Sequence, residues 1–429
     1  MPVHEDGSEE IYLAGNSLGL APIAAGEMVN AELEIWSDRG VRGHFGGPTA
    51  WMPYHELVGP SMARLVGGLD AEVVAMNSLT VNLHLMLAAF YQPVGARRRV
   101  LIEEHAFPSD HFAAESHLEQ RGQDPSETLV TVGPEPGSEL LDLDIIEAKI
   151  RSEGEQLALV LLPGVHYFTG QVLDMERLVT AAHEVGAVIG FDLAHAVGNV
   201  ALELHRWGAD FAVWCTYKYL NAGPGSVGGC FVHERHLGAA APPHFKGWWG
   251  TDPATRFKME NDFEPRPTAE AWQLSNAPIF SMAALRASLD VFDTLGTTPV
   301  QGPPAQAGSG GSGPLGAGPE GAPVGPMGRL SAKSRAMAEH FDRLLADGLG
   351  GRVETITPLE PSRRGAQRSL RITPDGPKGG WEVFQIVEDS GVACDWRHPD
   401  VIRVAPVPLY NRFADIDEFV ARLRAALDS

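Results

Sequence analysis

The sequence predicts an α/β fold in which a mostly parallel central sheet lies between layers of helices, with a smaller α+β domain attached. Strand-like apolar runs alternate with helical stretches from residue 98 to residue 220, and this alternation is typical of parallel strands joined by crossover helices. The C-terminal third instead combines helices with short strands, such as residues 369–374 and 401–407. A chain of 429 residues is long enough for one large domain and a smaller one.

The elements of the predicted sheet follow one another in the first half of the chain. Strands are expected at residues 98–104, 157–164, 187–195 and 209–220, and helices at residues 143–150, at residues 175–186 and after Ser78. Sheets of this kind bind ligands at the carboxyl ends of their strands. The residues that follow the apolar runs are therefore the first candidates for chemistry.

A tract rich in glycine and proline, residues 301–328, separates two helical stretches. It holds ten Gly and six Pro in 28 residues, and such a composition buries too little apolar surface to offset the entropy of ordering the backbone. The flanking residues 276–296 and 330–349 carry apolar side chains at helical spacing. We therefore predict a flexible insertion between two helices.

Composition excludes several classes of protein. With 33 basic and 55 acidic residues the net charge is −22, which disfavours binding to nucleic acid or to an anionic membrane surface. Cys215, Cys230 and Cys394 are too few and too scattered for a disulfide framework, and none forms a CxxC pair that would indicate zinc. Without a signal-like N-terminus or an apolar run of membrane-spanning length, we expect a soluble cytoplasmic enzyme.

The start of the helix after Ser78 is a candidate anion site. Free backbone N–H groups at a helix N-terminus favour a phosphate, and Ser78, Leu79 and Thr80 stand where they would surround one. The alternative is that Asn77 or Ser78 only caps the helix.

Two further candidates follow apolar strands. Asp192 ends one strand and is followed by His195; a buried carboxylate needs a positive partner, such as a protonated pyridine nitrogen, unless it only caps the next helix. Lys218 lies 26 residues after Asp192, between Tyr217 and Tyr219. Shielded from bulk water, it would form a Schiff base with an aldehyde. A phosphate cradle, a carboxylate and a lysine in this order are what a pyridoxal phosphate site needs.

Three more residues have both a functional and a structural interpretation. Phe107 would stack on a flat cofactor ring or simply pack in the core. Asp110 would line the site or cap a helix. Arg403, within an apolar run, would hold a carboxylate in bidentate fashion or form a structural salt bridge.

Longer motifs carry a resemblance that covers nearly the whole chain. They include IYLAGNSLGL, MNSLTVNLHLMLAAFYQP, HAFPSDHFAAESHL, GFDLAHAVGN, WCTYKYLNAGPGSVGG, LSNAPIF and GVACDWRHPDVIRVAPVPLYN. The sequence resembles the kynureninase family, pyridoxal-phosphate-dependent enzymes of the aspartate-aminotransferase-like fold type I. The resemblance implies a large domain at residues 50–290 and a small domain at residues 1–49 and 291–429. The tract at 301–328 does not match the family.

The resemblance also implies roles for particular residues. Lys218 would carry the Schiff base, with Tyr217 as the acid for the β-carbanion. The cofactor-binding residues would be Leu79, Thr80, Phe107, Asp110, Asp192, His195, Tyr217 and Lys218, with Trp248 and Asn276 reaching across from the second subunit of a homodimer. The substrate-binding residues would be Arg403, for the α-carboxylate, with Asn16, Ser17, His44 and Ser275.

The activity that the resemblance implies is hydrolysis of L-kynurenine to anthranilate and L-alanine, and of 3-hydroxykynurenine to 3-hydroxyanthranilate and L-alanine, in tryptophan catabolism or NAD biosynthesis. The combination of His44, Ser275 and Asn276 resembles that of family members that favour the 3-hydroxy substrate. Thr251 stands where many relatives have histidine. The alternatives are a cysteine desulfurase or aminotransferase of the same fold, or a scaffold that retains the fold without activity.

Overall fold

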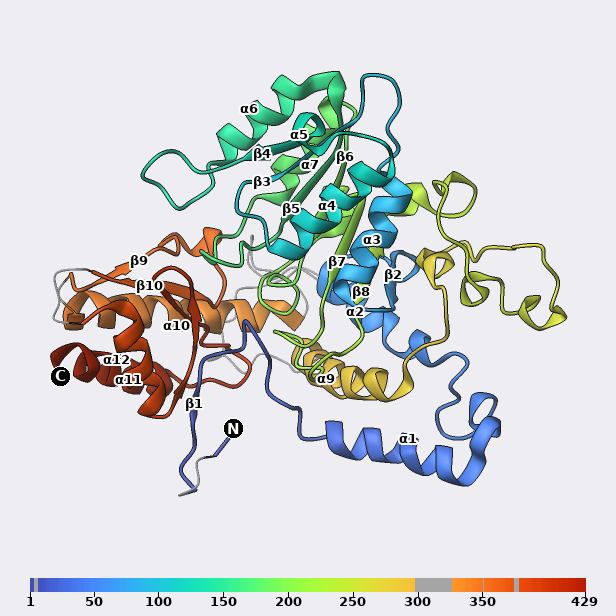
Figure 1. Cartoon of the computed structure of the whole chain (residues 1–429). Coiled ribbons are helices and arrows are strands. Elements are labelled where there is room, and N and C mark those ends of the chain that lie inside the picture. Colours follow the sequence, from blue (N-terminus) through green and yellow to red (C-terminus); the bar gives the residue numbers. More distant parts are fainter. Residues whose placement is uncertain (4–6, 298–325, 350, 374–377) are drawn as a thin grey trace, which may run out of the picture.

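The computed structural model describes residues 1–3, 7–297, 326–349, 351–373 and 378–429 (Figure 1). Its centre is a seven-stranded sheet of order β2-β8-β7-β6-β5-β3-β4. The strands are β2 (Val73–Ala75), β3 (Arg99–Glu103), β4 (Leu129–Val132), β5 (Leu157–Pro163), β6 (Val188–Asp192), β7 (Phe211–Trp214) and β8 (Gly229–Val232). The predicted mostly parallel sheet is confirmed.

One strand of this sheet runs against the others. The pairs β4–β3, β3–β5, β5–β6 and β6–β7 are parallel, whereas β8 is antiparallel to both β7 and β2. Residues 215–228 join β7 to β8 without a crossover helix, and a parallel connection needs such a crossover. Because β7 and β8 lie side by side, the chain turns back at the carboxyl end of β7.

Helices cover both faces of the sheet (Figure 1). One layer holds α3 (Leu79–Phe90) and α4 (Pro108–Gln120), whose apolar side chains form one buried cluster with the strands. The other layer holds α2 (Gly59–Val66), α6 (Leu143–Glu153), α7 (Met175–Glu184) and α9 (Ile279–Thr297). The short helices α5 (Pro125–Thr128) and α8 (Leu204–Trp207) lie in connections. The strands β5 and β7 are buried along their whole length, as a covered parallel sheet requires.

The C-terminal part forms a separate core beside a four-stranded antiparallel sheet of order β12-β13-β10-β9. These strands are β9 (Val353–Thr355), β10 (Arg368–Ile372), β12 (Asp395–Arg397) and β13 (Val401–Val404), and the helices packed with them are α10 (Pro326–Leu349), α11 (Gly380–Asp389) and α12 (Phe413–Asp428). Near the N-terminus, β1 (Ile11–Tyr12) pairs with β11 (Val392–Ala393).

Helix α1 (Ala25–Arg39) extends along α9, and its Met28, Val29 and Ile35 pack against the large core. The Gly- and Pro-rich tract predicted at 301–328 lies outside the described residues, except that residues 326–328 begin α10. In the described part of the chain, no helix combines the length and the apolar character needed to cross a bilayer.

Candidate active site

A cavity lies where β3, β5, β6 and β7 end at the carboxyl edge of the sheet. Its lining consists of Leu79, Thr80, Glu103, Phe107, Ser109, Asp110, Pro163, Val165, Tyr167, Asp192, Ala194, His195, Tyr217 and Lys218. Eight of the predicted site residues are therefore brought together from four separate segments of the chain. This is the position at which parallel sheets of this kind bind their ligands.

Lys218 contacts His195 at the floor of the cavity. The Lys218 Nζ atom lies 3.0 Å from His195 Nε2 and 6.0 Å from the centre of the Phe107 ring. Burial, together with the positive charge of Lys218, lowers the pKa of His195 well below its usual value, so the imidazole is neutral. Among the described residues, no partner reaches its buried Nδ1 atom. A neutral ring can accept a hydrogen bond from the Lys218 amine at this distance.

Two carboxyl groups face each other in the same cavity. Asp192 is 8 % exposed and Asp110 is 5 % exposed, and burial followed by mutual repulsion raises the pKa of Asp110, while burial raises that of Asp192. The Asp192 Oδ1 atom accepts a hydrogen bond of 2.7 Å from the Ala194 N–H, which is a local turn rather than a helix cap. In the part of the chain that the structure describes, Asp110 Oδ1 has no partner.

Glu103 was not predicted from the sequence, although it ends an apolar strand as Asp192 does. Burial, with a contribution from Asp192, raises the pKa of Glu103 to about 8. Three acidic groups and one amine thus line the same cavity, and a cationic group there would relieve the repulsion among the acids. The signal that could have found Glu103 is its place at the carboxyl end of β3.

Two helix N-termini point their first turns at the other end of the cavity. Ser78 is the N-cap of α3 but its side chain makes no capping hydrogen bond, so the N–H groups of Leu79 and Thr80 remain open to a ligand. The Thr80 hydroxyl lies 2.8 Å from the hydroxyl of Ser109 in the first turn of α4. Ser109 was also missed, because only the fold brings the second helix start beside the first.

Aromatic side chains form one wall. Phe107 is 43 % exposed, which excludes simple core packing, and its ring packs edge-on against Tyr167 with 5.4 Å between centroids. Tyr217 lines the cavity beside Lys218, and burial raises the pKa of its phenol, so this side chain stays protonated. The backbone N–H of Gly19 donates to the Tyr217 carbonyl and anchors this turn.

Arg403 lies next to this cavity on β13. Its guanidinium donates to Asp395 from Nε at 2.7 Å and also from Nη2, and to the Tyr167 carbonyl from Nη1 at 2.6 Å. The structural salt bridge that the sequence left as an alternative is therefore present. Ser17 donates to the same Asp395 carboxylate at 2.5 Å and Asn16 at 3.5 Å.

The remaining predicted residues lie away from this cavity. In the described part of the chain, its lining does not include Trp248, His44, Ser275 or Asn276. Trp248 is 46 % exposed and packs edge-on against Phe257, and His44 packs edge-on against Trp51. Ser275 and Asn276 are exposed, and the Thr251 hydroxyl donates to the Trp248 carbonyl.

The cavity fits pyridoxal phosphate on features of this chain. It combines a wall that a ring can stack on, an amine, acidic groups for a ring cation, and two open helix starts with hydroxyls for a phosphate. A Cβ atom on Gly228 would lie 3.1 Å from the Leu79 N atom, so glycine keeps the helix start clear. Each feature matches one part of the cofactor.

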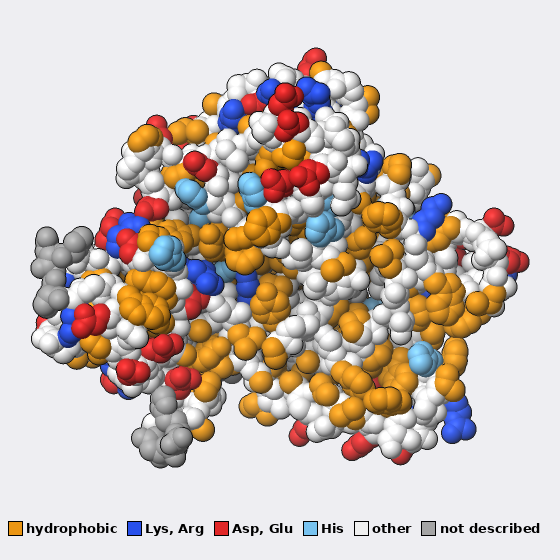
Figure 2. Space-filling model, viewed as in Figure 1, with side chains coloured by type: hydrophobic (Ala, Val, Ile, Leu, Met, Phe, Trp, Pro, Cys, Tyr) orange, Lys and Arg blue, Asp and Glu red, His pale blue; other side chains and the backbone are white. Residues whose placement is uncertain are grey.

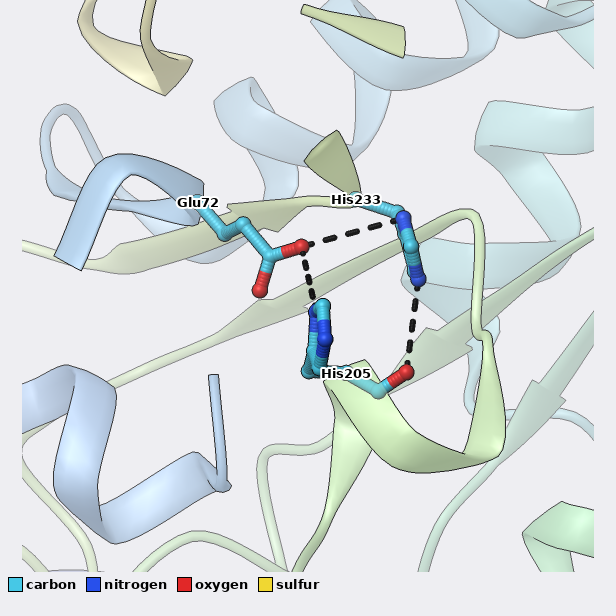
Figure 3. Close-up of side chains that lie close together, drawn as sticks. All are labelled: Glu72, His205 and His233. Carbon is cyan, nitrogen blue, oxygen red and sulfur yellow. Dashed lines mark hydrogen bonds and ion pairs between the residues drawn. The ribbon is translucent and has the colours of Figure 1, made fainter. Parts of the chain in front are cut away.

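A second cluster of histidine and carboxylate lies outside the cavity (Figure 3). The fully buried Glu72 accepts hydrogen bonds of 2.9 Å from His205 Nδ1 and 2.8 Å from the Glu234 N–H, and His233 Nδ1 accepts from the Arg235 N–H. The two imidazole rings stack with 17° between planes, so their in-plane lone pairs do not converge on one point. We interpret this cluster as structural rather than as a metal site.

Comparison with known proteins agrees with this geometry. Residues 330–423 match the family model of the kynureninase C-terminal domain, and residues 58–303 match that of aminotransferase class V. A kynureninase of Xanthomonas oryzae pv. oryzae is 48% identical over 99% of this chain and 92% of its own length. A kynureninase of Xanthomonas campestris pv. campestris is 48% identical over 96% of this chain and 90% of its own.

Solved structures show the same fold at low sequence identity. The cystine C–S lyase C-DES, in complex with cysteine persulfide, is 17% identical with a TM-score of 0.73 over 97% of this chain and 98% of its own. A cysteine desulfurase of Thermococcus onnurineus is 16% identical with a TM-score of 0.73 over 100% and 99%. The family models, the relatives and the fold together place this chain in the kynureninase family of pyridoxal-phosphate-dependent, fold type I enzymes.

Proposed function

We propose that this chain is a kynureninase that uses pyridoxal phosphate to hydrolyse L-kynurenine to anthranilate and L-alanine, and 3-hydroxykynurenine to 3-hydroxyanthranilate and L-alanine. The observation that carries the proposal is the position of Lys218 Nζ, which lies 3.0 Å from His195 in a cavity shared with Asp192 and Phe107. An amine within reach of both an aromatic wall and a buried acid is what covalent attachment of the cofactor requires.

Bound at this site, pyridoxal phosphate supplies an electron sink for the charge that develops on the substrate carbons. Lys218 would hold the cofactor through a Schiff base and is placed to move a proton at the substrate α-carbon. Asp192 would pair with the ring nitrogen and keep it protonated, because a buried carboxylate gains from a cationic neighbour. The helix starts at Leu79, Thr80 and Ser109 would hold the phosphate.

Tyr217 fits the acid that protonates the β-carbon after the C–C bond breaks. Its phenol lines the cavity beside Lys218, and burial keeps it protonated. Arg403 binds the substrate α-carboxylate with the donors that Asp395 and Tyr167 leave free.

The active enzyme is a homodimer whose sites are shared. Hydrophobic side chains gather over the lower and right-hand parts of the view in Figure 2, where α1 and the yellow-green loops that precede α9 lie in Figure 1. Exposed aromatic rings contact one another across these segments, with 6.0 Å between the ring centres of Trp36 and Phe280, 5.9 Å for Phe45 and Phe257, and 5.4 Å for Trp248 and Phe257. Contiguous apolar surface of this kind marks an interface. Trp248 and Asn276 would complete the partner's cavity, and His44 and Ser275 its substrate pocket.

The reaction is tested by the release of fluorescent anthranilate from kynurenine by the purified holoenzyme. Wild-type protein should release it, and Lys218→Ala should lose both this activity and the absorbance of covalently held cofactor. Lys149→Ala, a surface lysine paired with Glu153, is the matched control and should behave as wild type. Cofactor binding without release of anthranilate would contradict the assignment.

Shared sites are tested by mixing two inactive variants. Lys218→Ala and Trp248→Ala chains, mixed and allowed to exchange subunits, should regain activity because a heterodimer holds one site with both residues intact. No recovery despite proven exchange would contradict the shared site.

The expected substrate preference comes from the resemblance to the family rather than from the cavity. We expect 3-hydroxykynurenine to be preferred, and parallel steady-state assays with both substrates decide this. A cytoplasmic location remains a prediction. The desulfurase alternative is disfavoured because Cys215, Cys230 and Cys394 are all buried, whereas such chemistry needs an accessible thiolate.

A further inference from the structure

The donors of Arg403 are already divided between two partners before any substrate binds. A guanidinium has five N–H groups. The Nε edge faces the Asp395 carboxylate in a two-point contact, and Nη1 donates to the Tyr167 carbonyl. One N–H on each of Nη1 and Nη2 remains. The Nη1–Nη2 edge, which Asp395 leaves open, is one of the two edges by which a guanidinium binds a carboxylate in bidentate fashion.

Asp395 is itself held in place by the opposite end of the chain. It lies directly opposite Arg403 in the β12–β13 pair, and Ser17 donates to its carboxylate at 2.5 Å. Burial alone would raise the pKa of Asp395, but hydrogen bonds and charge from Arg403, with the Ser17 bond, lower it below its usual value. The carboxylate is therefore ionised and rigidly bonded.

The charges around Asp395 also match a single anionic group. Arg397 Nη2 lies 3.7 Å from the same carboxylate oxygen, so two guanidinium groups flank one carboxylate and the local charge is one unit positive. In the described structure, the buried Nε atom of Arg397 has no hydrogen-bond partner. A substrate carboxylate would neutralise this excess.

We propose that Asp395 is a positioning residue for substrate recognition: by occupying the Nε edge of Arg403, it turns the Nη1–Nη2 edge toward the substrate α-carboxylate, and Asn16 and Ser17 act through Asp395. The inference rests on the proposed function, because it assigns the carboxylate to an amino-acid substrate. Arg403 without Asp395 would keep its charge but lose its fixed orientation, and orientation is what bidentate recognition requires.

The test separates ligands by whether they carry the α-carboxylate. In the Asp395→Asn holoenzyme, the KM for kynurenine and the inhibition constant for L-alanine should both rise roughly ten- to hundredfold, the range for a charged hydrogen bond. The kcat should change less than KM. Kynurenamine, which lacks the α-carboxylate, should bind as in wild type, measured by the absorbance of the bound cofactor. Ser17→Ala should give a smaller change of the same pattern.

Asp400→Asn is the matched control, because Asp400 bonds Arg371 Nε at 2.8 Å in the same small sheet; its KM should equal that of wild type. A KM for Asp395→Asn within about twofold of wild type would overturn the proposal. So would equal weakening of kynurenamine and L-alanine, since that pattern means a general structural role. If wild type released no anthranilate, the proposed function would fail, yet the two binding measurements would still decide the role of Asp395.

Discussion

Buried carboxylates at the amino ends and at the carboxyl ends of the central strands differ in how many hydrogen bonds the chain supplies to them. Just before β7, Asp210 accepts four hydrogen bonds, at 2.9 Å from His183, 2.9 Å from the Ile189 N–H, 2.7 Å from His236 and 3.2 Å from Arg235. At the carboxyl end of β6, Asp192 accepts one backbone hydrogen bond.

The pKa values follow this difference in partners. Burial would raise the pKa of Asp210, but hydrogen bonds from His183, His236 and Ile189 lower it below its usual value. Burial raises the pKa of Asp192 instead. Glu72, before β2, resembles Asp210 in having its bonds supplied by the chain (Figure 3). The chain supplies several hydrogen bonds to each structural carboxylate. Buried carboxyl groups with few partners therefore indicate where a ligand would provide the missing ones.

Replacing Asp192 should produce the largest effect. In Asp192→Asn the ring nitrogen loses its charged partner, and kcat should fall by about a hundredfold or more. The fold should persist, because the asparagine amide oxygen still accepts the Ala194 N–H. Steady-state anthranilate release and a thermal melt measure the two quantities. A near-normal kcat would contradict the role of Asp192 as the partner of the ring nitrogen.

Replacing Asp210 should affect stability and spare catalysis. Asp210→Asn removes the charge that binds His183, His236 and Arg235, and the free energy of unfolding should fall by about 2–4 kcal/mol. The kcat of the folded fraction should stay near that of wild type. Denaturant unfolding and activity at low temperature test this pair. Equal stability of variant and wild type would show that the four bonds contribute little.

The stability of wild type and of Asp210→Asn should also depend differently on pH. Because the folded-state pKa of Asp210 is lowered, its stabilisation is fully present above the unfolded value of about 3.9 and is lost as pH falls through the folded value. The stability difference between wild type and Asp210→Asn should therefore shrink as pH falls below about pH 4. Unfolding curves across this range decide; a difference that stays constant contradicts the assignment.

A smaller effect is expected at the phosphate end. Ser109→Ala removes one hydroxyl beside Thr80, and the affinity for pyridoxal phosphate should fall about two- to tenfold, as for one hydrogen bond. Ser116→Ala, further along α4 with its hydroxyl bonded to the Ala113 carbonyl, is the control and should leave cofactor affinity unchanged. Titration of the apoenzyme measures both. Equal affinities for the two variants would remove Ser109 from the site.

The sequence predicts those residues whose role depends on local order along the chain. Lys218, Asp192 and His195 follow apolar strands directly, so the alternation of strands and helices places them at one edge. Similarly, Phe107 precedes a helix that begins with Pro108. The reversed strand β8 was not predicted, because its direction depends on the loop at 215–228 rather than on apolar periodicity.

Contacts between residues far apart in the sequence could not be predicted. Ser17 and Asp395 are 378 positions apart, and Tyr167 and Arg403 are 236 positions apart. No local pattern marks such pairs. Trp248 and Asn276 were expected to reach the site of a second subunit, and that role cannot be recognised from the pattern of one chain.

Lys218 is the residue on which the proposed function most depends, because it would hold pyridoxal phosphate covalently. Borohydride reduction of the holoenzyme, followed by proteolysis and mass spectrometry, locates the cofactor directly. We expect the reduced cofactor to be attached to the peptide containing Lys218 and to no other lysine. Attachment elsewhere, or no attachment in a holoenzyme that cleaves kynurenine, would contradict it.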